Sequence, residues 1–304
     1  MTQAADYPIK PVRLIVGYPA GGTSDIIARL LGQKLGELWG QSVTVENRPG
    51  AGGIIAAEYA AKSAGDGYTM LLGNNSILAN NTALYDNLPY DPVRDFAPVM
   101  LIAAQPNVLV VNPALPVRSL KQLIALDKSH PGQLSYASAG GGEVAHLSAE
   151  LFKSMAKVNI VHVLYKGAEP ALAAIMGGQT DMMFATSSTV VGHIGAGRLR
   201  GLAVTSATRL SRFPELPTMI ESGVPGFEAT SWHGVVVPSR TPPAIVSRLN
   251  ADLNKVLKMP DLRDRFSALA METLGGTARD FVAYMRQEIP KWTKLIKEAK
   301  VRGQ

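Results

Sequence analysis

The segment 18–25, with the sequence Tyr-Pro-Ala-Gly-Gly-Thr-Ser-Asp, places two glycines directly before three residues that favour the start of a helix. It follows an apolar run at 12–16 and precedes a run at 24–38 whose apolar residues recur at helical spacing. Glycines allow backbone N–H groups to turn inward, and the N-terminus of a helix carries a partial positive charge. This order of residues predicts a loop that binds an anion.

A second segment has the same layout. At 134–143 the sequence Leu-Ser-Tyr-Ala-Ser-Ala-Gly-Gly-Gly-Glu runs from a predicted strand through small polar and glycine residues into a predicted helix. Two such helix N-termini, in two halves of the chain, predict a cleft that holds an acid from both sides.

Neutral polar residues recur where other predicted strands end. Ligands of open α/β sheets bind at the carboxyl ends of the strands. The side chains of Ser, Thr and Asn donate and accept hydrogen bonds but are poor nucleophiles and bases. Their recurrence at strand ends therefore indicates binding and not catalysis. Small polar residues are also common in ordinary turns, and that alternative stays open for each one. The residues are Thr23, Ser24, Asn74, Asn75, Ser76, Ser138, Thr186, Ser187 and Ser188.

Several catalytic motifs are missing from the sequence. There is no Cys, no G-x-S-x-G elbow and no G-K-[ST] after the glycines of segment 18–25. The five His residues include no pair spaced i, i+4 with a Glu, so no zinc site is expected. We interpret His162, in an apolar strand, and His146, behind the second glycine loop, as structural residues. His233, next to Trp232, is the histidine that we place at the cleft.

A dinucleotide-binding loop is the sharpest alternative. Gly140, Gly142 and Ala145 match G-x-G-x-x-A between a strand and a helix. However, the next predicted strand ends with Val163-Leu164-Tyr165-Lys166, which supplies no acidic residue for a ribose hydroxyl.

Length and composition indicate a globular protein of two domains. The chain has 304 residues, of which 46% are apolar and 18% charged, and no apolar run reaches the 18 or more residues of a membrane helix. The net charge is +6, but Lys and Arg are scattered and aromatic residues are few, which argues against nucleic-acid binding. We interpret the charge as a mild attraction for anionic ligands.

Short apolar runs alternate with helical patterns, which predicts a doubly wound α/β fold with a mostly parallel sheet covered on both faces. We expect strands at 12–17, 42–46, 68–73, 107–112, 134–138, 159–164, 180–184, 200–205 and 231–237. Helices are expected at 24–38, 53–63, 119–127, 144–155, 169–176, 189–195, 243–257, 261–269 and 278–299. Pro and Gly residues around 86–98 and 213–227 mark two crossings between lobes, which predicts lobe 1 at 1–103 plus 225–304 and lobe 2 at 104–224.

Short motifs from about residue 7 to about residue 299 resemble, in order and spacing, the Bug/TctC family of extracytoplasmic solute receptors. The longest are Tyr7-Pro8-x-Lys10-Pro11-x-Arg13-x-Ile15-Val16, the loop 20–25 and Val45-Glu46-Asn47-Arg48-Pro49-Gly50-Ala51-Gly52-Gly53. Shorter ones lie at 66–69, 88–92, 95–98, 165–167 and 225–228.

The resemblance implies a type II-like periplasmic binding protein with two α/β lobes, two crossovers that form a hinge, and a ligand cleft between the lobes. Such a receptor captures a small di-, tri- or aromatic carboxylate and delivers it to the membrane subunits of a tripartite tricarboxylate transporter. It is not an enzyme, has no cofactor or metal, and is monomeric. We expect a mature periplasmic chain whose signal peptide is absent from this sequence. A sensory binding protein that signals to a membrane kinase is the alternative.

The ligand-binding residues expected from the loops and from the resemblance lie at six strand ends. They are Tyr18, Ala20, Gly21, Gly22, Thr23, Ser24, Asn74, Asn75, Ser76, Ser138, Ala139, Gly141, Gly142, Tyr165, Gly167, Phe184, Ala185, Thr186, Trp232 and His233.

Three further features bear on the expected ligand. Asp25 is expected to brace its loop, because a carboxylate there would repel an anion. The chain departs from the family pattern at Glu143 and Ala185, which argues against a simple amino-acid or citrate-like ligand. With Tyr18, Phe184 and Trp232 nearby, an aromatic or longer-chain acid becomes an option.

Overall fold

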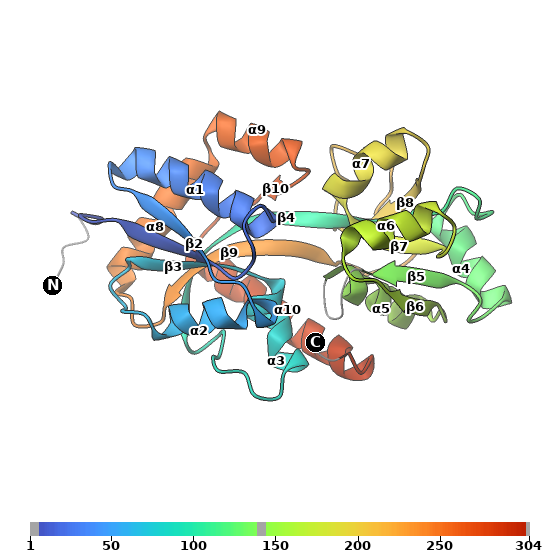
Figure 1. Cartoon of the computed structure of the whole chain (residues 1–304), viewed down its shortest axis with the longest axis horizontal. Helices are drawn as coiled ribbons and strands as arrows, with labels where there is room; N and C mark the ends of the chain where they lie inside the picture. Colours follow the sequence, from blue (N-terminus) through green and yellow to red (C-terminus); the bar gives the residue numbers. More distant parts are fainter. Residues whose placement is uncertain (1–5, 139–143, 302–304) are drawn as a thin grey trace. The chain divides into compact units, whose positions relative to one another are not determined.

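The computed structural model describes residues 6–138 and 144–301, which form two compact units (Figure 1). Unit 1 contains Met1–Ala104 and Trp232–Lys297, and unit 2 contains Gln105–Ser231 and the segment from Glu298. The chain leaves unit 1 within strand β4 (Phe96–Val111) and returns within strand β9 (Thr230–Pro238). The predicted lobe boundaries at 103/104 and 224/225 stay predictions.

Unit 1 is built on a mixed sheet with the strand order β2-β1-β3-β9-β4 and β10 beside β4. Strand β1 pairs in parallel with β2 and β3, whereas β9 is antiparallel to β3. Every residue of β1 except Arg13 is buried, as expected for a strand covered on both faces. The remaining strands are β1 (Val12–Val16), β2 (Val43–Asn47), β3 (Thr69–Asn74) and β10 (Glu272–Thr273).

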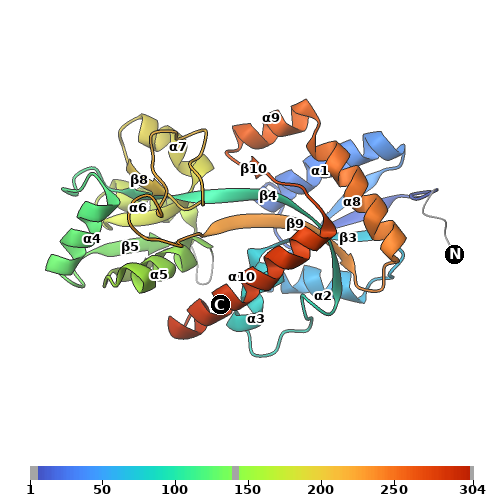
Figure 2. The same ribbon diagram turned by 180° about the vertical axis from the view of Figure 1, so that it is seen from behind.

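Helices cover both faces of the unit 1 sheet (Figures 1 and 2). On one face, α1 (Thr23–Trp39), α8 (Pro243–Leu257) and α9 (Pro260–Ala268) pack on the sheet through one apolar cluster that includes Leu14, Leu31 and Leu249. The other face carries α2 (Ile54–Lys62) and α10 (Ala278–Glu298). Three short turns of helix complete unit 1: η1 (Ala51–Gly53) directly precedes α2, and η2 (Ser76–Asn80) and α3 (Asn81–Leu84) follow β3.

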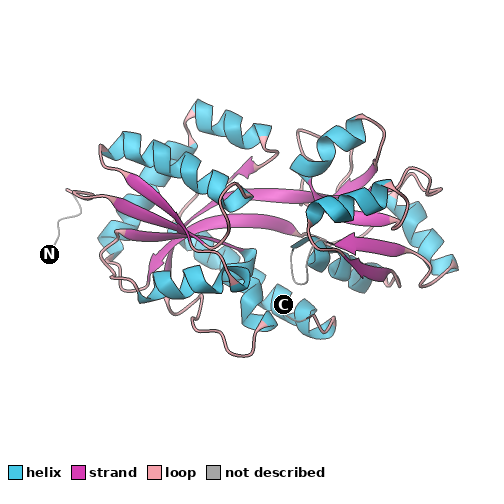
Figure 3. Ribbon diagram, viewed as in Figure 1, coloured by secondary structure: helices cyan, strands magenta, loops and turns pink. Residues whose placement is uncertain are grey.

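Unit 2 has its own sheet, whose strands are drawn in magenta in Figure 3. The strand order is β4-β7-β5-β6, with β8 beside β4. Strand β5 pairs in parallel with β6 and β7, and β4 is antiparallel to β7 and β8. The strands are β5 (Ser135–Ser138), β6 (Val161–Leu164), β7 (Met182–Thr186) and β8 (Arg200–Val204). The helices are α4 (Leu120–Ser129), α5 (Val144–Ala156), α6 (Ala168–Met176) and α7 (Ser187–Gly195).

Each strand and helix predicted from the sequence is present, but the sheet is mixed and not mostly parallel. Strand β9 brings the chain back from unit 2 and therefore enters the unit 1 sheet without the crossover helix that makes successive strands parallel. Strand β4 begins at Phe96, whereas the sequence predicted a start at residue 107. The first part of the strand was missed because it contains Pro98 and Pro106, and proline lacks the N–H that a strand ladder uses.

The close packing of β9 against α10 leads to a stability prediction. A Cβ atom built on Gly234 would lie 2.2 Å from Cζ of Phe281, whose ring is buried. We expect Gly234→Val to lower the free energy of unfolding by about 1 to 3 kcal/mol, because overpacking forces side chains out of their rotamers. Chemical denaturation measures this change. Gly192→Ala, in helix α7, is the control, because a Cβ atom at Gly192 has no neighbouring atom within 4 Å. An equal decrease in the free energy of unfolding in this control would contradict the packing explanation.

Candidate functional site

The loop after β1 presents exposed backbone at the start of helix α1. Gly22 is the N-cap residue, with an extended backbone and no side-chain cap, and Gly21 has φ +85°. Thr23, Ser24 and Asp25, which favour the start of a helix, are the first three helical residues, and none of them is the N-cap residue. The first N–H groups of an α-helix have no acceptor within the helix. The exposed residues of the loop are Pro19, Ala20, Gly21 and Gly22, while Tyr18 and Thr23 are half-buried.

Asp25 braces this loop, as expected. Its carboxylate accepts hydrogen bonds of 2.9 Å from the backbone N–H of Gly21, from Nε of Arg29 and from Nδ2 of Asn47. The hydrogen bond from Arg29 is the main reason why the pKa of Asp25 is lowered to about 2. The buried carboxylate is therefore ionised at neutral pH, and the guanidinium beside it offsets its charge.

Asn47 is a residue whose role the sequence did not reveal. Its Nδ2 also donates to the backbone oxygen of Tyr18 at 3.0 Å, so one side chain from the end of β2 fixes both ends of the loop. The signal in the sequence was the Glu46-Asn47-Arg48-Pro49 motif, but only the pairing of β2 with β1 brings Asn47 to the loop.

Ser24 and His233 form a buried pair inside unit 1. Ser24 Oγ lies 3.0 Å from Nε2 of His233 on β9, and both residues are buried. Burial lowers the pKa of His233 to about 4, so the imidazole is neutral at physiological pH. The structure thus brings these two predicted site residues together, bonded to each other.

The residues after β3 divide into two roles. Asn74 shares hydrogen bonds of 3.1 to 3.3 Å with the hydroxyl of Tyr18, which places both beside the loop. Asn75 is buried, and its Oδ1 accepts a 2.7 Å hydrogen bond from the backbone N–H of Trp232. Ser76 is half-buried at the start of η2. Asn74 therefore borders the loop, whereas Asn75 fixes β9.

The indole of Trp232 belongs to the core of unit 1. It is fully buried, packs edge-on against Phe281 and Tyr284, and donates from Nε1 to Glu288 at 2.9 Å. Side chains alternate along a strand, so Trp232 points to the α10 face while His233 points to the opposite face and α1. We therefore leave Trp232 out of the proposed site.

Phe184 and Ala185 are core residues of unit 2. The ring of Phe184 is fully buried beside Phe152 and Phe227, and Ala185 lies in the apolar cluster on the other face of β7. Neither Phe184 nor Trp232 presents a ring at the surface, so Tyr18 is the one of the three aromatic residues that borders the loop after β1.

Other predicted residues of unit 2 gather at one edge of its sheet. Strands β5, β6 and β7 are parallel, so their carboxyl ends meet at the same edge. Ser138 ends β5, Tyr165 follows β6 and donates its N–H to the oxygen of Ser138 at 2.9 Å, and Gly167 and Thr186 are the N-cap residues of α6 and α7. Tyr165, Gly167 and Thr186 are half-buried. Ala139, Gly141, Gly142 and Glu143 lie outside the described residues.

Two histidines pack beside Ser138. The rings of His146 and His162 stack with centroids 4.3 Å apart, and Nε2 of His162 lies 2.6 Å from the hydroxyl oxygen of Ser138. Tyr136 stacks on His162 from β5. Burial is the main cause that lowers the pKa of both histidines, that of His146 to about 4. The sequence interpretation of these residues as structural fits this packing.

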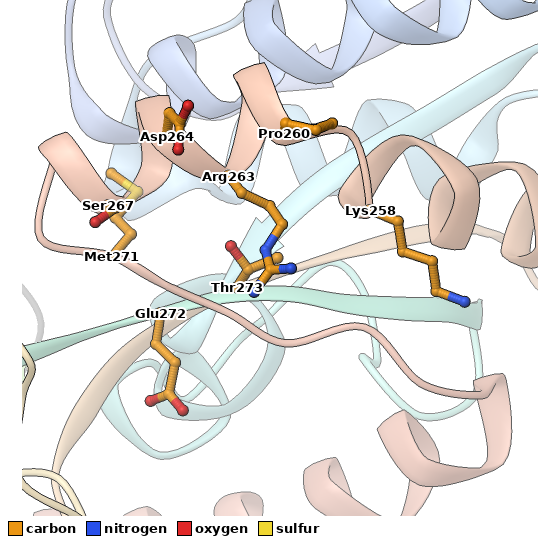
Figure 4. Close-up of a pocket in the computed structure, with 8 residues that line it drawn as sticks. All are labelled: Lys258, Pro260, Arg263, Asp264, Ser267, Met271, Glu272 and Thr273. Atoms are coloured by element: carbon orange, nitrogen blue, oxygen red, sulfur yellow. The ribbon is translucent and has the colours of Figure 1, made fainter.

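A separate cavity of unit 1 has a different chemistry. It has a volume of about 600 Å³ and lies beside α9 and β10 (Figure 4). Two cations and two acids line it, so its charges balance, and none of its lining residues belongs to the predicted site. These residues are Lys258, Pro260, Arg263, Asp264, Ser267, Met271, Glu272 and Thr273.

Within residues 6–138 and 144–301, no group of three or more His, Asp or Glu side chains is placed to hold a metal ion. In the same part of the chain, no helix combines the length and the apolar character that crossing a membrane requires.

Comparison with known proteins decides the family. Residues 27–301 match the family described as tripartite tricarboxylate transporter family receptor, TctC. The chain belongs to the TctC family. This confirms the resemblance stated from the sequence motifs, and it identifies the family as one of receptors.

Individual TctC relatives agree with this result. Protein BugT of Bordetella pertussis is 38% identical over 296 residues, which is 97% of this chain and 91% of BugT. A structure of an R. palustris protein with adipate is 38% identical, has a TM-score of 0.82 and covers 97% of this chain and 99% of that one. MatC from Rhodopseudomonas palustris with bound malate is 31% identical, with a TM-score of 0.78 and coverage of 95% and 100%. The expected α/β periplasmic-binding-protein fold is thereby confirmed.

The stacked histidines predict how acid affects stability. A folded-state pKa of about 4 for His146 lies below the ordinary value of 6.5. The unfolded chain therefore takes up a proton as the pH falls through 6.5, while the folded chain does not until about pH 4. The stability that depends on neutral His146 is complete above about pH 6.5 and is lost as the pH falls toward 4. Glu150, which favours the protonated form, and Lys153, which opposes it, are the charged groups nearby.

We expect His146→Phe to remove about 1 to 2 kcal/mol of the stability lost between pH 7 and pH 5, measured by urea denaturation at each pH. The ring of Phe preserves the stacking but does not titrate. The slope of stability against pH between these two values should therefore be smaller in His146→Phe than in the original chain. An unchanged slope in His146→Phe would contradict the prediction.

Proposed function

We propose that this TctC-family chain is a periplasmic receptor that binds a small aliphatic dicarboxylate and delivers it to the membrane subunits of a tripartite tricarboxylate transporter. The observation that carries this proposal is the exposed Gly21–Gly22 backbone at the positive end of helix α1. The carboxylate of Asp25 is already paired with Arg29, so it leaves that end of the helix open to an incoming anion.

The proposed ligand class follows from relatives. Structures of a 38% identical protein with adipate and of a 31% identical protein with malate show that TctC-family proteins of this fold hold dicarboxylates. Each unit has neutral hydrogen-bond donors at its strand ends, and such groups bind carboxylates. Hydrogen bonds to an ionised carboxylate are stronger than those between neutral groups, so neutral donors suffice. The proposed contacts are Tyr18, Ala20, Gly21, Gly22, Thr23, Asn74, Ser76, Ser138, Ala139, Gly141, Gly142, Tyr165, Gly167 and Thr186.

The periplasmic location and the transporter partner rest on the family. The matched family is defined as a transporter receptor, and the structure of BugD, 34% identical to this chain with a TM-score of 0.79, is that of a periplasmic binding protein.

Thermal unfolding of the purified chain against a panel of acids tests the ligand class. The panel contains adipate, malate, citrate, benzoate and oxidised nicotinamide dinucleotide. We expect a melting temperature that rises with the concentration of the aliphatic dicarboxylates, because a ligand that binds only the folded state stabilises it by mass action. Stabilisation by the dinucleotide alone, or by none of the acids, would contradict the proposal.

The two ends of helix α1 offer a matched pair of variants for the site. Gly21 and Gly40 both have positive φ, +85° and +64°, and a Cβ at either position meets nothing within 4 Å. Each change to Ala therefore strains the backbone by about 1 to 2 kcal/mol without a steric clash. We expect Gly21→Ala to weaken adipate binding about tenfold, since the strained loop shifts its N–H groups, whereas Gly40→Ala should lower stability alone. Calorimetric titration distinguishes the two, and equal affinities would place the anion elsewhere.

A further inference from the structure

A single side chain of β9 holds the first turn of helix α1. His233 Nε2 lies 3.0 Å from Oγ of Ser24, the second residue of the helix, although 209 positions separate the two residues in the sequence. Both side chains are buried, with exposed fractions of 5% and 6%. Water therefore cannot replace either partner at low cost, and a buried hydroxyl or imidazole left alone costs free energy.

The backbone around His233 is fixed by the neighbouring strand end. His233 pairs with Asn74 across β3 and β9, and the N–H of the preceding Trp232 donates to Oδ1 of Asn75 at 2.7 Å. The imidazole thus projects from a rigid point. Because Asn74 also donates a hydrogen bond to the hydroxyl of Tyr18, the same strand end contacts the loop that precedes helix α1.

We propose that His233 is a positioning residue, which sets the orientation of the first turn of α1, and so of the anion-binding backbone, through its hydrogen bond to Ser24. This differs from the direct ligand contact that the sequence suggested for both residues. The imidazole acts by geometry and not by charge, because burial keeps it neutral, with a pKa of about 4. The inference rests on the proposed carboxylate-binding function.

A double-mutant cycle on adipate and malate affinity, measured by calorimetric titration, tests the inference. We expect Ser24→Ala and His233→Leu each to weaken binding about tenfold, and the double variant to weaken it by about the same factor instead of a hundredfold. His233→Gln should bind within about threefold of the original chain, since an amide can both donate to and accept from the serine hydroxyl. The control Ser148→Ala removes another buried serine hydroxyl, in unit 2, and should leave affinity unchanged.

Three outcomes separate the possibilities. If Ser24→Ala and His233→Leu lower the melting temperature but leave affinity unchanged, the pair is only structural and the inference is wrong. The affinities of the original chain and of His233→Gln are also compared between pH 8 and pH 6. If the original chain binds increasingly more tightly than His233→Gln as the pH falls, imidazolium charge attracts the ligand and the inference is wrong. If the original chain binds neither acid at any pH, the proposed function itself fails.

Discussion

The pairing of Asp25 with Arg29 is the interaction on which the proposed site depends. The carboxylate of Asp25, in the first turn of α1, is stabilised by the helix dipole, but its negative charge also reduces the positive potential that would attract an anionic ligand. The guanidinium compensates the charge, while the same carboxylate holds Gly21 and, through Asn47, the end of β2. One acid therefore shapes the loop, and the exposed glycine backbone remains the part that presents positive charge.

The elements of the fold could be predicted because their signals are local. Apolar runs and helical spacing located β1 and α1 to within a residue or two, and the glycines marked the loop between them. The direction of β9 and the length of β4 could not be predicted in this way, since both depend on how the chain crosses between its two units and on prolines that a strand tolerates only in certain positions.

The candidate site was predictable as a set of loops but not as a set of contacts. Ser24 and His233 are far apart in the sequence, and only the pairing of β3 with β9 brings them within hydrogen-bond distance. The faces of Trp232 and Phe184 depend on strand register, which a single sequence does not define. Both residue types suit a binding site as well as a core, and here packing against Phe281 and Phe227 decides for the core.

The order of the two units along the chain has a consequence for how the protein folds. Residues 105–231 are continuous, so unit 2, apart from the segment that begins at Glu298, makes its contacts within one uninterrupted stretch. In unit 1, Leu71 pairs with Val236, so its sheet cannot close until the chain on the far side of unit 2 has arrived. Long-range pairings of this kind slow folding, because the chain loses the entropy of closing a long loop before it gains the stabilising contacts between the two strands. The part of unit 1 that is synthesised first therefore has to wait for the last part of the chain before its sheet is complete.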